Sequence, residues 1–512
     1  MNKRQISYPI NDRWSYLWLL VATVLGIFTL SAGKWIVPIA GWLGAIFYLR
    51  FFRTQRRVWL AFLLAAISIG IAAAVVLPTF TGPMGLPLII ATALFSALPL
   101  LADRWLAPRL PGFASTLAFP LAMTALEFIG SVTSPFGSSG LAVYTQYNNL
   151  ALLQLVSLTG MWGLLFLMRW LGSIANWAWE RDFAWPEIKR GVLFYTGLIL
   201  LVLVYGQARL WFAPTPAQTV RVAGVSMVEW RLNQPAMSQA FATDLDAFRQ
   251  MMEERYQLYF DATLKEARAG AKMISWPENA ATGAEEDEPA LLTRLQELAK
   301  QESVYLAIPM VVMPTDDSPY ANKLLIFDPH GQVVVEHYKY GGSGMEGNRI
   351  SGDRVLHTAQ TPFGVISGVI CWDTLLQGVV LQAGRNGTDI LFTPSLVYPE
   401  LDPVFAQYSV TRAIENGVSV IHVSDMGLSV ITDPYGRILA ATDHYPQGER
   451  VIVAQIPTQG AWTLYPFIGD LFGWLAVVGF VVLVIWGIVQ SLRSRKVKAA
   501  SPESQPQVGQ AI

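Results

Sequence analysis

The stretch GVISGVICWD, residues 364–373, decides the fold of the central part of this chain. Its first seven residues are small, apolar or β-branched, a pattern typical of a buried strand. Cys371 is the only cysteine among 512 residues, which excludes an intrachain disulfide and a cysteine-rich zinc site. A lone thiol in a strand is usually a small buried hydrophobe. This thiol stands where the strand ends, so it could serve as a nucleophile if a base or a cation lies beside it.

Segments of similar character surround this stretch. Nine runs between Thr219 and Ile456 are rich in β-branched residues and have the length of strands. Two Asp-Pro-x-Gly turns, at residues 328–331 and 433–436, each lie between two such runs and predict hairpins. Segments of helical composition lie at Pro235–Ala269, Pro289–Gln301 and Val404–Asn416. The region is predicted to be a layered α/β domain with a mixed sheet, and periodicity leaves open whether there is one sheet or two.

Charge separates this domain from the rest of the chain. Hydrophobic residues make up 53% of the sequence and charged residues 14%, which excludes a disordered chain and disfavours a fully soluble enzyme. Of the 73 charged side chains, 46 lie within residues 220–457. The net charge of −1 gives no basic field that would favour nucleic acid as a partner.

Apolar runs near the length of a membrane-spanning helix flank the charged region. Seven precede it, and one follows it. The eight runs are Trp14–Ala32, Trp35–Phe52, Val58–Leu77, Leu86–Leu101, Phe113–Val132, Leu150–Ile174, Val192–Leu210 and Phe467–Ile488.

The basic residues predict the orientation of these spans. With the amino terminus in the cytoplasm, sixteen lysines and arginines fall in cytoplasmic segments, whereas the short outer segments hold Lys34 and Arg209. This asymmetry follows the positive-inside rule, and both termini are then cytoplasmic. We predict a seven-helix transmembrane domain over 1–218, an extracytoplasmic domain over 219–458, a transmembrane helix over 459–492 and a cytoplasmic tail over 493–512.

One carboxylate falls inside the predicted spans. Glu127 lies in the outer half of the fifth run, where a charge is costly unless it is paired. We expect a structural role with Arg209 as its partner, and contact with a substrate head group is the alternative.

Two further side chains stand at strand ends in the extracytoplasmic region. Glu278 closes a strand in Ile274–Asn279, where Pro277 stops ladder hydrogen bonding. Lys339 ends the strand that precedes Gly341–Gly344. Alone, each is most simply a surface residue, but the ordered set Glu278, Lys339 and Cys371 is far more specific.

With these residues the sequence resembles the nitrilase, or carbon–nitrogen hydrolase, superfamily, whose members carry a Glu-Lys-Cys triad on an αββα sandwich. WPEN at 276–279 matches its glutamate motif, Cys371-Trp372-Asp373 its cysteine motif, and Arg412–Asn416 the segment after the cysteine. The resemblance implies that Glu278 is the proton acceptor, Lys339 stabilises the oxyanion and Cys371 is the nucleophile. It implies no cofactor and no metal.

Within the superfamily, seven helices before the hydrolase domain and one after it resemble the apolipoprotein N-acyltransferase family. Leu152–Gly163 and Ser424–Ser429 are similar to that family's signatures. The family's Pro-Phe-Gly-Glu loop is replaced by Gly341–Asn348, and its Ser-Asn-Asp motif by Ser395-Leu396-Val397. Glu346 lies one position from the family's second functional glutamate, and the resemblance implies that the backbone N–H of Trp372 is a supporting oxyanion donor.

The resemblance implies a phospholipid acyl donor, a thioester on Cys371 and a diacylglyceryl lipoprotein as acceptor. It also implies that the protein lies in the bacterial inner membrane, with the catalytic domain on the periplasmic side. One rival interpretation is a membrane-anchored amidase that hydrolyses small amides and shares the triad. A second rival is a transporter or sensor whose outer domain only binds a ligand.

Overall fold

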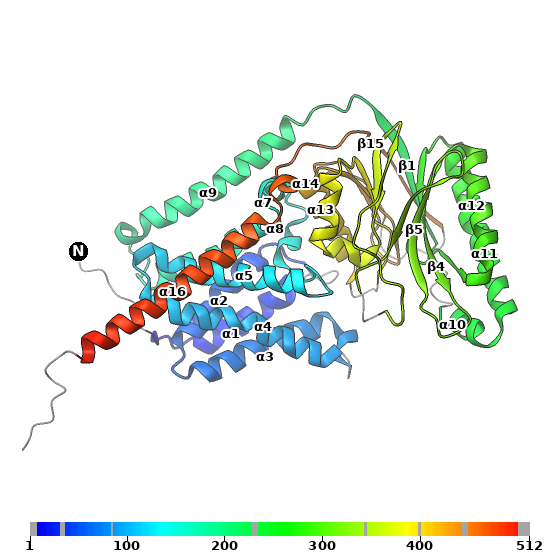
Figure 1. The fold of residues 1–512 in the computed structure, drawn as a ribbon. Coiled ribbons are helices and arrows are strands. Elements are labelled where there is room, and N and C mark those ends of the chain that lie inside the picture. The colour runs from blue at the N-terminus through cyan, green and yellow to red at the C-terminus, as the bar shows by residue number, and fades with distance from the viewer. Residues whose placement is uncertain are drawn as a thin grey trace, which may run out of the picture.

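A computed structural model describes residues 8–30, 36–82, 85–227, 234–342, 346–397, 401–442 and 449–499. The helices before residue 212 and the last helix form a helical part, and two sheets with their covering helices form the rest (Figure 1). The last helix continues to Ala499, so residues 493–499 of the predicted tail are helical. Residues 500–512 of that tail lie outside the described residues.

Each of the eight apolar runs contains helix. The main helices are α1 (Ser15–Thr29), α2 (Ala40–Thr54), α3 (Val58–Val76), α4 (Gly85–Leu106), α5 (Ala118–Thr133), α8 (Met161–Trp179), α9 (Trp185–Trp211) and α16 (Leu471–Ala499). Among the described residues, five helical stretches are long and apolar enough to cross a membrane. They are Val58–Val76, Gly85–Arg109, Gly112–Thr133, Trp185–Trp211 and Leu471–Arg493.

The sixth predicted span, Leu150–Ile174, is not one helix. It divides into α6 (Leu150–Leu153), α7 (Val156–Thr159) and the start of α8. Gly160 stands at the break with a φ of 60°, in the left-handed region that favours glycine. A Cβ there would lie 2.5 Å from the ring of Tyr465, so the close contact also requires glycine. Hydropathy does not report backbone conformation, which is why the run looked continuous.

Glu127 is paired inside the helical part, but not with the predicted partner. Its Oε1 lies 2.5 Å from Nη2 of Arg169 on α8, and both side chains are largely buried. Arg209 instead donates a hydrogen bond to Gln154. The prediction of a Glu127–Arg209 pair is therefore wrong, because two residues on different helices cannot be matched from sequence spacing alone.

The remaining chain forms two main sheets. The seven-stranded sheet has the order β15 (Glu449–Pro457), β1 (Thr219–Met227), β2 (Met273–Ser275), β4 (Tyr305–Met313), β5 (Ala321–Phe327), β6 (Val333–Tyr338), with β3 (Ala281–Ala284) also paired to β4. The six-stranded sheet has the order β14 (Ile438–Ala441), β13 (Val430–Thr432), β11 (Ser419–His422), β9 (Ile390–Phe392), β8 (Gly364–Gly368), β7 (Thr358–Thr361). A short parallel pair joins β10 (Ser395–Leu396) to β12 (Ser424–Asp425).

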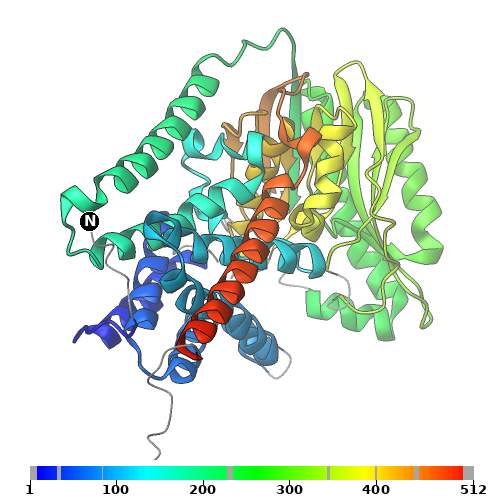
Figure 2. The same ribbon diagram turned by 60° about the vertical axis from the view of Figure 1, so that its left-hand side comes forward.

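The two sheets pack face to face, and helices cover both outer faces. Apolar side chains of both sheets share one buried cluster, which includes Leu324 and Phe392. Three helices, α10 (Gln234–Thr243), α11 (Leu245–Arg268) and α12 (Glu288–Glu302), cover the seven-stranded sheet. Two helices, α13 (Gln377–Arg385) and α14 (Val404–Asn416), cover the six-stranded sheet and lie between it and the helical part (Figures 1 and 2). The result is an α-β-β-α sandwich whose last layer faces the helical part.

Candidate active site

Glu278, Lys339 and Cys371 meet at one end of the sandwich. Glu278 follows β2 and Lys339 follows β6, both from the seven-stranded sheet, while Cys371 follows β8 of the six-stranded sheet. All three are buried, with 3%, 1% and 2% of their surfaces exposed. The three strand ends therefore converge from two facing sheets on one enclosed point.

Glu278 is held by three donors. Its Oε1 accepts hydrogen bonds from Lys339 Nζ at 2.7 Å and from Asn322 Nδ2 at 2.9 Å. Its Oε2 accepts the backbone N–H of Leu396 at 3.0 Å. The Cys371 thiol donates to the carbonyl of the same Leu396 residue, with Sγ 3.8 Å from the oxygen, so Leu396 contacts both the thiol and the carboxylate. The carboxylate is thus fixed next to both the lysine and the thiol.

The charges within the site shift its pKa values. Burial alone would lower the pKa of Lys339, but the carboxylates of Glu278 and Glu346, with Cys371, outweigh it and raise that pKa above its ordinary value. Burial, followed by the charge of Glu278, raises the pKa of Cys371, and Lys339 only partly offsets this. These directions favour a protonated resting thiol beside a cationic lysine, so attack by sulfur would require a base that takes the proton during the reaction.

The backbone presents the thiol in a constrained turn. Cys371 has a φ of 47°, an unfavourable value for a residue with a side chain, and opens the 3₁₀ turn Cys371–Leu375. Its N–H donates to Pro394 O at 2.9 Å, and Thr374 Oγ1 donates to Cys371 O at 2.7 Å. We call residues 371–375 the nucleophile turn, after the role that the sequence predicts for Cys371.

Asp373 connects the nucleophile turn to β6 and to the residues that follow it, next to Lys339. Its Oδ1 accepts the N–H groups of Tyr340 and Gly341, and its Oδ2 accepts Ile370 N–H and hydrogen-bonds His337 Nε2 at 2.9 Å. Burial opposes ionisation, but the partners outweigh it and hold the pKa of Asp373 below its ordinary value. In the same pair, burial would lower the pKa of His337, and Asp373 raises it.

The two supporting residues also lie beside the triad. Glu346 forms an ion pair with Lys339 and lies 3.3 Å from Arg349 Nε. Burial raises the pKa of Glu346 against the effect of Lys339. Trp372 packs edge-on against Phe405 of α14, with ring centroids 5.3 Å apart.

Sequence reasoning did not identify Asn322 or the Asp373–His337 pair. Asn322 lies within β5, and an asparagine inside an apolar strand is a signal that could have been noticed, since strands are depleted in this residue. Asp373 was part of the quoted cysteine motif, but its partner comes from a strand 36 residues away. Only the paired sheets bring them together.

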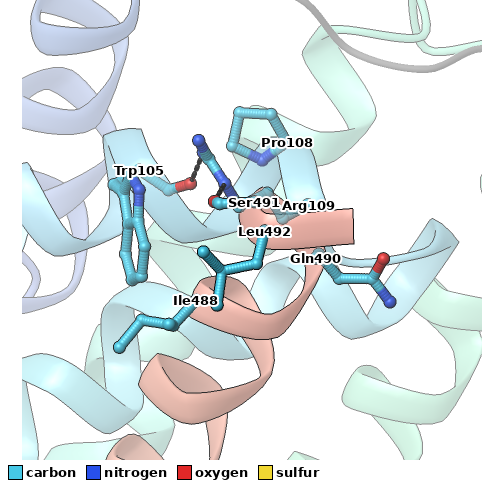
Figure 3. A pocket seen from close by; sticks show the side chains of 7 residues that line it. All are labelled: Trp105, Pro108, Arg109, Ile488, Gln490, Ser491 and Leu492. Carbon is cyan, nitrogen blue, oxygen red and sulfur yellow. Dashed lines mark hydrogen bonds between the residues drawn. The ribbon is translucent and has the colours of Figure 1, made fainter. Parts of the chain in front are cut away.

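A separate crevice of about 660 Å³ lies far from this site, beside the end of α16 that points away from the sheets (Figures 1 and 3). Arg109 closes one side of it by a hydrogen bond of 3.0 Å from Nε to Ser491 Oγ. None of the triad residues lines it. Its lining residues are Trp105, Pro108, Arg109, Ile488, Gln490, Ser491 and Leu492.

Comparison with known proteins gives the following similarities. The carbon-nitrogen hydrolase family matches residues 231–463. An apolipoprotein N-acyltransferase of Geobacter metallireducens is 25% identical over 410 residues, covering 73% of this chain and 74% of the relative. An apolipoprotein N-acyltransferase of Bradyrhizobium diazoefficiens is 24% identical over 455 residues, covering 81% of this chain and 79% of the relative. The crystal structure of an amidase from Nesterenkonia sp. is 18% identical and covers 48% of this chain and 94% of that chain, with a TM-score of 0.39.

Proposed function

This chain belongs to the apolipoprotein N-acyltransferase family within the carbon–nitrogen hydrolases, and on that premise we propose how its residues carry out N-acyl transfer. The donor is a membrane phospholipid, and the acceptor is the α-amino group of the N-terminal diacylglyceryl-cysteine of a lipoprotein. The observation that carries the proposal is the buried hydrogen bond between Glu278 and Lys339 beside Cys371, whose thiol contacts the same Leu396 residue as Glu278 does.

In the first step the Cys371 sulfur attacks an acyl ester carbonyl of the phospholipid while Glu278 takes the thiol proton. The Lys339 ammonium and the Trp372 backbone N–H stabilise the tetrahedral oxyanion. When the C–O bond breaks, Glu278 returns the proton to the leaving alcohol. Lysophospholipid departs, and the acyl group remains on Cys371 as a thioester.

In the second step the acceptor amine attacks the thioester carbonyl. Glu278 takes a proton from the amine, the C–S bond breaks, and Glu278 returns this proton to the thiolate of Cys371. The products are an amide on the lipoprotein and the free thiol. Lys339 stays cationic throughout, since Glu278 and Glu346 raise its pKa.

We further propose eight membrane crossings, with both termini in the cytoplasm and the sandwich on the periplasmic side of the inner membrane. The basic residues support this orientation. Both substrates carry acyl chains, and exposing each CH₂ to water costs about 0.8 kcal/mol. A catalytic domain held at the membrane surface avoids that cost, and this favours lipid substrates over small amides.

Intact-protein mass spectrometry tests the proposal. The full-length protein is mixed in detergent with a phospholipid of defined acyl chains, and we expect a mass increase of one acyl group that hydroxylamine removes. The Cys371→Ser variant should not give the hydroxylamine-labile adduct. Adding a diacylglyceryl-cysteine peptide should discharge the adduct and yield the N-acylated peptide. Absence of an adduct, together with ammonia release from small amides, would show an amidase instead.

A further inference from the structure

A segment of the helical part reaches the nucleophile turn. Residues 134–146 follow α5, and Ser138 within them donates from both N and Oγ to Leu375 O, at 3.0 and 2.9 Å. Gly137 has a φ of 53°, and a Cβ on it would lie 2.3 Å from the same carbonyl oxygen. Only glycine permits this approach. The last carbonyl of the nucleophile turn is therefore held by the helical part.

Arg412 of α14 holds the preceding carbonyl and the same segment. Its Nε donates to Thr374 O at 2.8 Å. Its Nη2 donates to Ser138 Oγ at 2.8 Å and to Tyr144 OH at 3.0 Å. The side chain is fully buried. One planar guanidinium thus joins the nucleophile turn, α14 and the 134–146 segment, a geometry that lysine cannot reproduce.

The charge of Arg412 is balanced by a residue that also contacts the helical part. Glu415 forms a buried ion pair with Arg412 through Nη1. Its Oε1 accepts the backbone N–H of Met161 at 2.8 Å, at the first residue of α8. A carboxylate at a helix N-terminus is electrostatically favourable. The pair therefore connects the nucleophile turn to two separate elements of the helical part.

We propose that Arg412 is a positioning residue through which the helical part sets the geometry of Cys371. The left-handed φ of Cys371 is maintained only if surrounding contacts fix the turn. Two of those contacts, at Thr374 O and Leu375 O, come from Arg412 and from Ser138 of the helical part. The helical part is then a component of the active site and not an anchor alone. This inference rests on the proposed role of Cys371 as nucleophile.

The test removes the helical-part side of this network in the full-length protein. The double variant Ser138→Ala, Tyr144→Phe takes two acceptors from Arg412 and keeps the aromatic contact of Tyr144 with Tyr408. The matched control is Tyr205→Phe, which removes a tyrosine hydrogen bond of 2.9 Å to Ser157 within the helical part, away from the nucleophile turn.

Two quantities are measured for each variant. The first is the rate of acyl-enzyme formation at saturating phospholipid, divided by the amount of Cys371 that iodoacetamide can alkylate after denaturation. The second is the pH profile of Cys371 alkylation in the folded protein. Because Cys371 is the only cysteine, both signals come from one thiol.

We expect the double variant to lose about tenfold to a hundredfold in acylation rate, as hydrogen bonds to a buried charge are lost, with little change in the half-saturating phospholipid concentration. Its alkylation midpoint should move down toward that of an ordinary thiol. Arg412→Lys should show the same loss, and Tyr205→Phe should match the wild type. If the double variant fails to fold, Tyr144→Phe alone should give a loss of several-fold.

A double variant that acylates at the wild-type rate and keeps the wild-type alkylation profile, even with a lower melting temperature, overturns the proposal. An Arg412→Lys variant that acylates at the wild-type rate also overturns the proposal, since a positive charge at this position would then suffice without the guanidinium geometry. If the wild type forms no acyl adduct, the proposed function fails. The alkylation profiles then still decide whether the helical part positions Cys371.

Discussion

Replacing Glu278 with glutamine tests the assignment of the proton acceptor. In the wild type, Glu278 accepts hydrogen bonds from Lys339, Asn322 and the N–H of Leu396. A glutamine amide nitrogen cannot accept, so at least one of these donors loses its partner, at a cost of about 1–3 kcal/mol. Lys339 keeps Glu346 as a counterion. The Glu278→Gln protein should therefore remain folded while lacking the base.

The variant should change two reactions of Cys371 in opposite directions. Loss of a general base lowers a rate by about 10²–10⁴-fold, so acylation by phospholipid should fall by this factor. The charge of Glu278 is, after burial, the main cause that raises the pKa of Cys371. Glu278→Gln should therefore lower that pKa, and alkylation by iodoacetamide at a fixed mildly alkaline pH should become faster.

The rates of Cys371 acylation and of Cys371 alkylation are both measured from time courses by intact-protein mass spectrometry. Glu253→Gln is the control, since it removes a carboxylate that pairs with Arg294 on the surface of the same domain and contributes little to stability. It should leave both rates unchanged. If Glu278→Gln lowers both rates by the same factor, the site has been distorted. If acylation falls by less than about tenfold, Glu278 is not the base.

Two other ion pairs give further predictions. The raised pKa of His337 means that its pair with Asp373 stabilises the fold fully below about pH 6.5 and loses this effect as pH rises through the folded-state pKa. Thermal unfolding should therefore show decreasing stability above neutral pH, and Asp373→Asn should reduce this pH dependence and destabilise the protein by about 3–5 kcal/mol. In the helical part, Glu127→Gln should lower the yield of folded protein, because Arg169 would keep its charge without a counterion, and the double change of both residues to leucine should restore the yield. Normal yield with lost turnover in Glu127→Gln would instead indicate a role in the reaction.

Local sequence patterns predicted the elements of the sandwich well. The helix Val404–Asn416 has the predicted bounds, and both Asp-Pro-x-Gly turns join antiparallel strands as expected. These features depend on neighbouring residues, which is the information that periodicity and turn chemistry contain. The short α13 (Gln377–Arg385) was missed, because nine residues give too few turns for a clear helical period.

The arrangement of the site depended on contacts that local patterns do not record. That Glu278, Lys339 and Cys371 stand near strand ends could be predicted, but not that the ends belong to two facing sheets. Arg412 belonged to a quoted motif, yet its partner Ser138 is 274 residues away. Long-range partners follow from packing, and a single sequence does not specify them.

The wall of the active site explains why one anchoring helix would not replace the helical part. Trp372, next to Cys371, packs edge-on against Phe405 of α14 and against Phe136, with ring centroids 5.3 and 6.0 Å away. Phe136 belongs to the same 134–146 segment that holds Leu375 O. The proposed thioester on Cys371 would have to be kept from water until the amine arrives, and Cys371 is only 2% exposed. Since the helical part supplies both an aromatic contact to Trp372 and hydrogen bonds to the nucleophile turn, we expect it to help exclude water from the site.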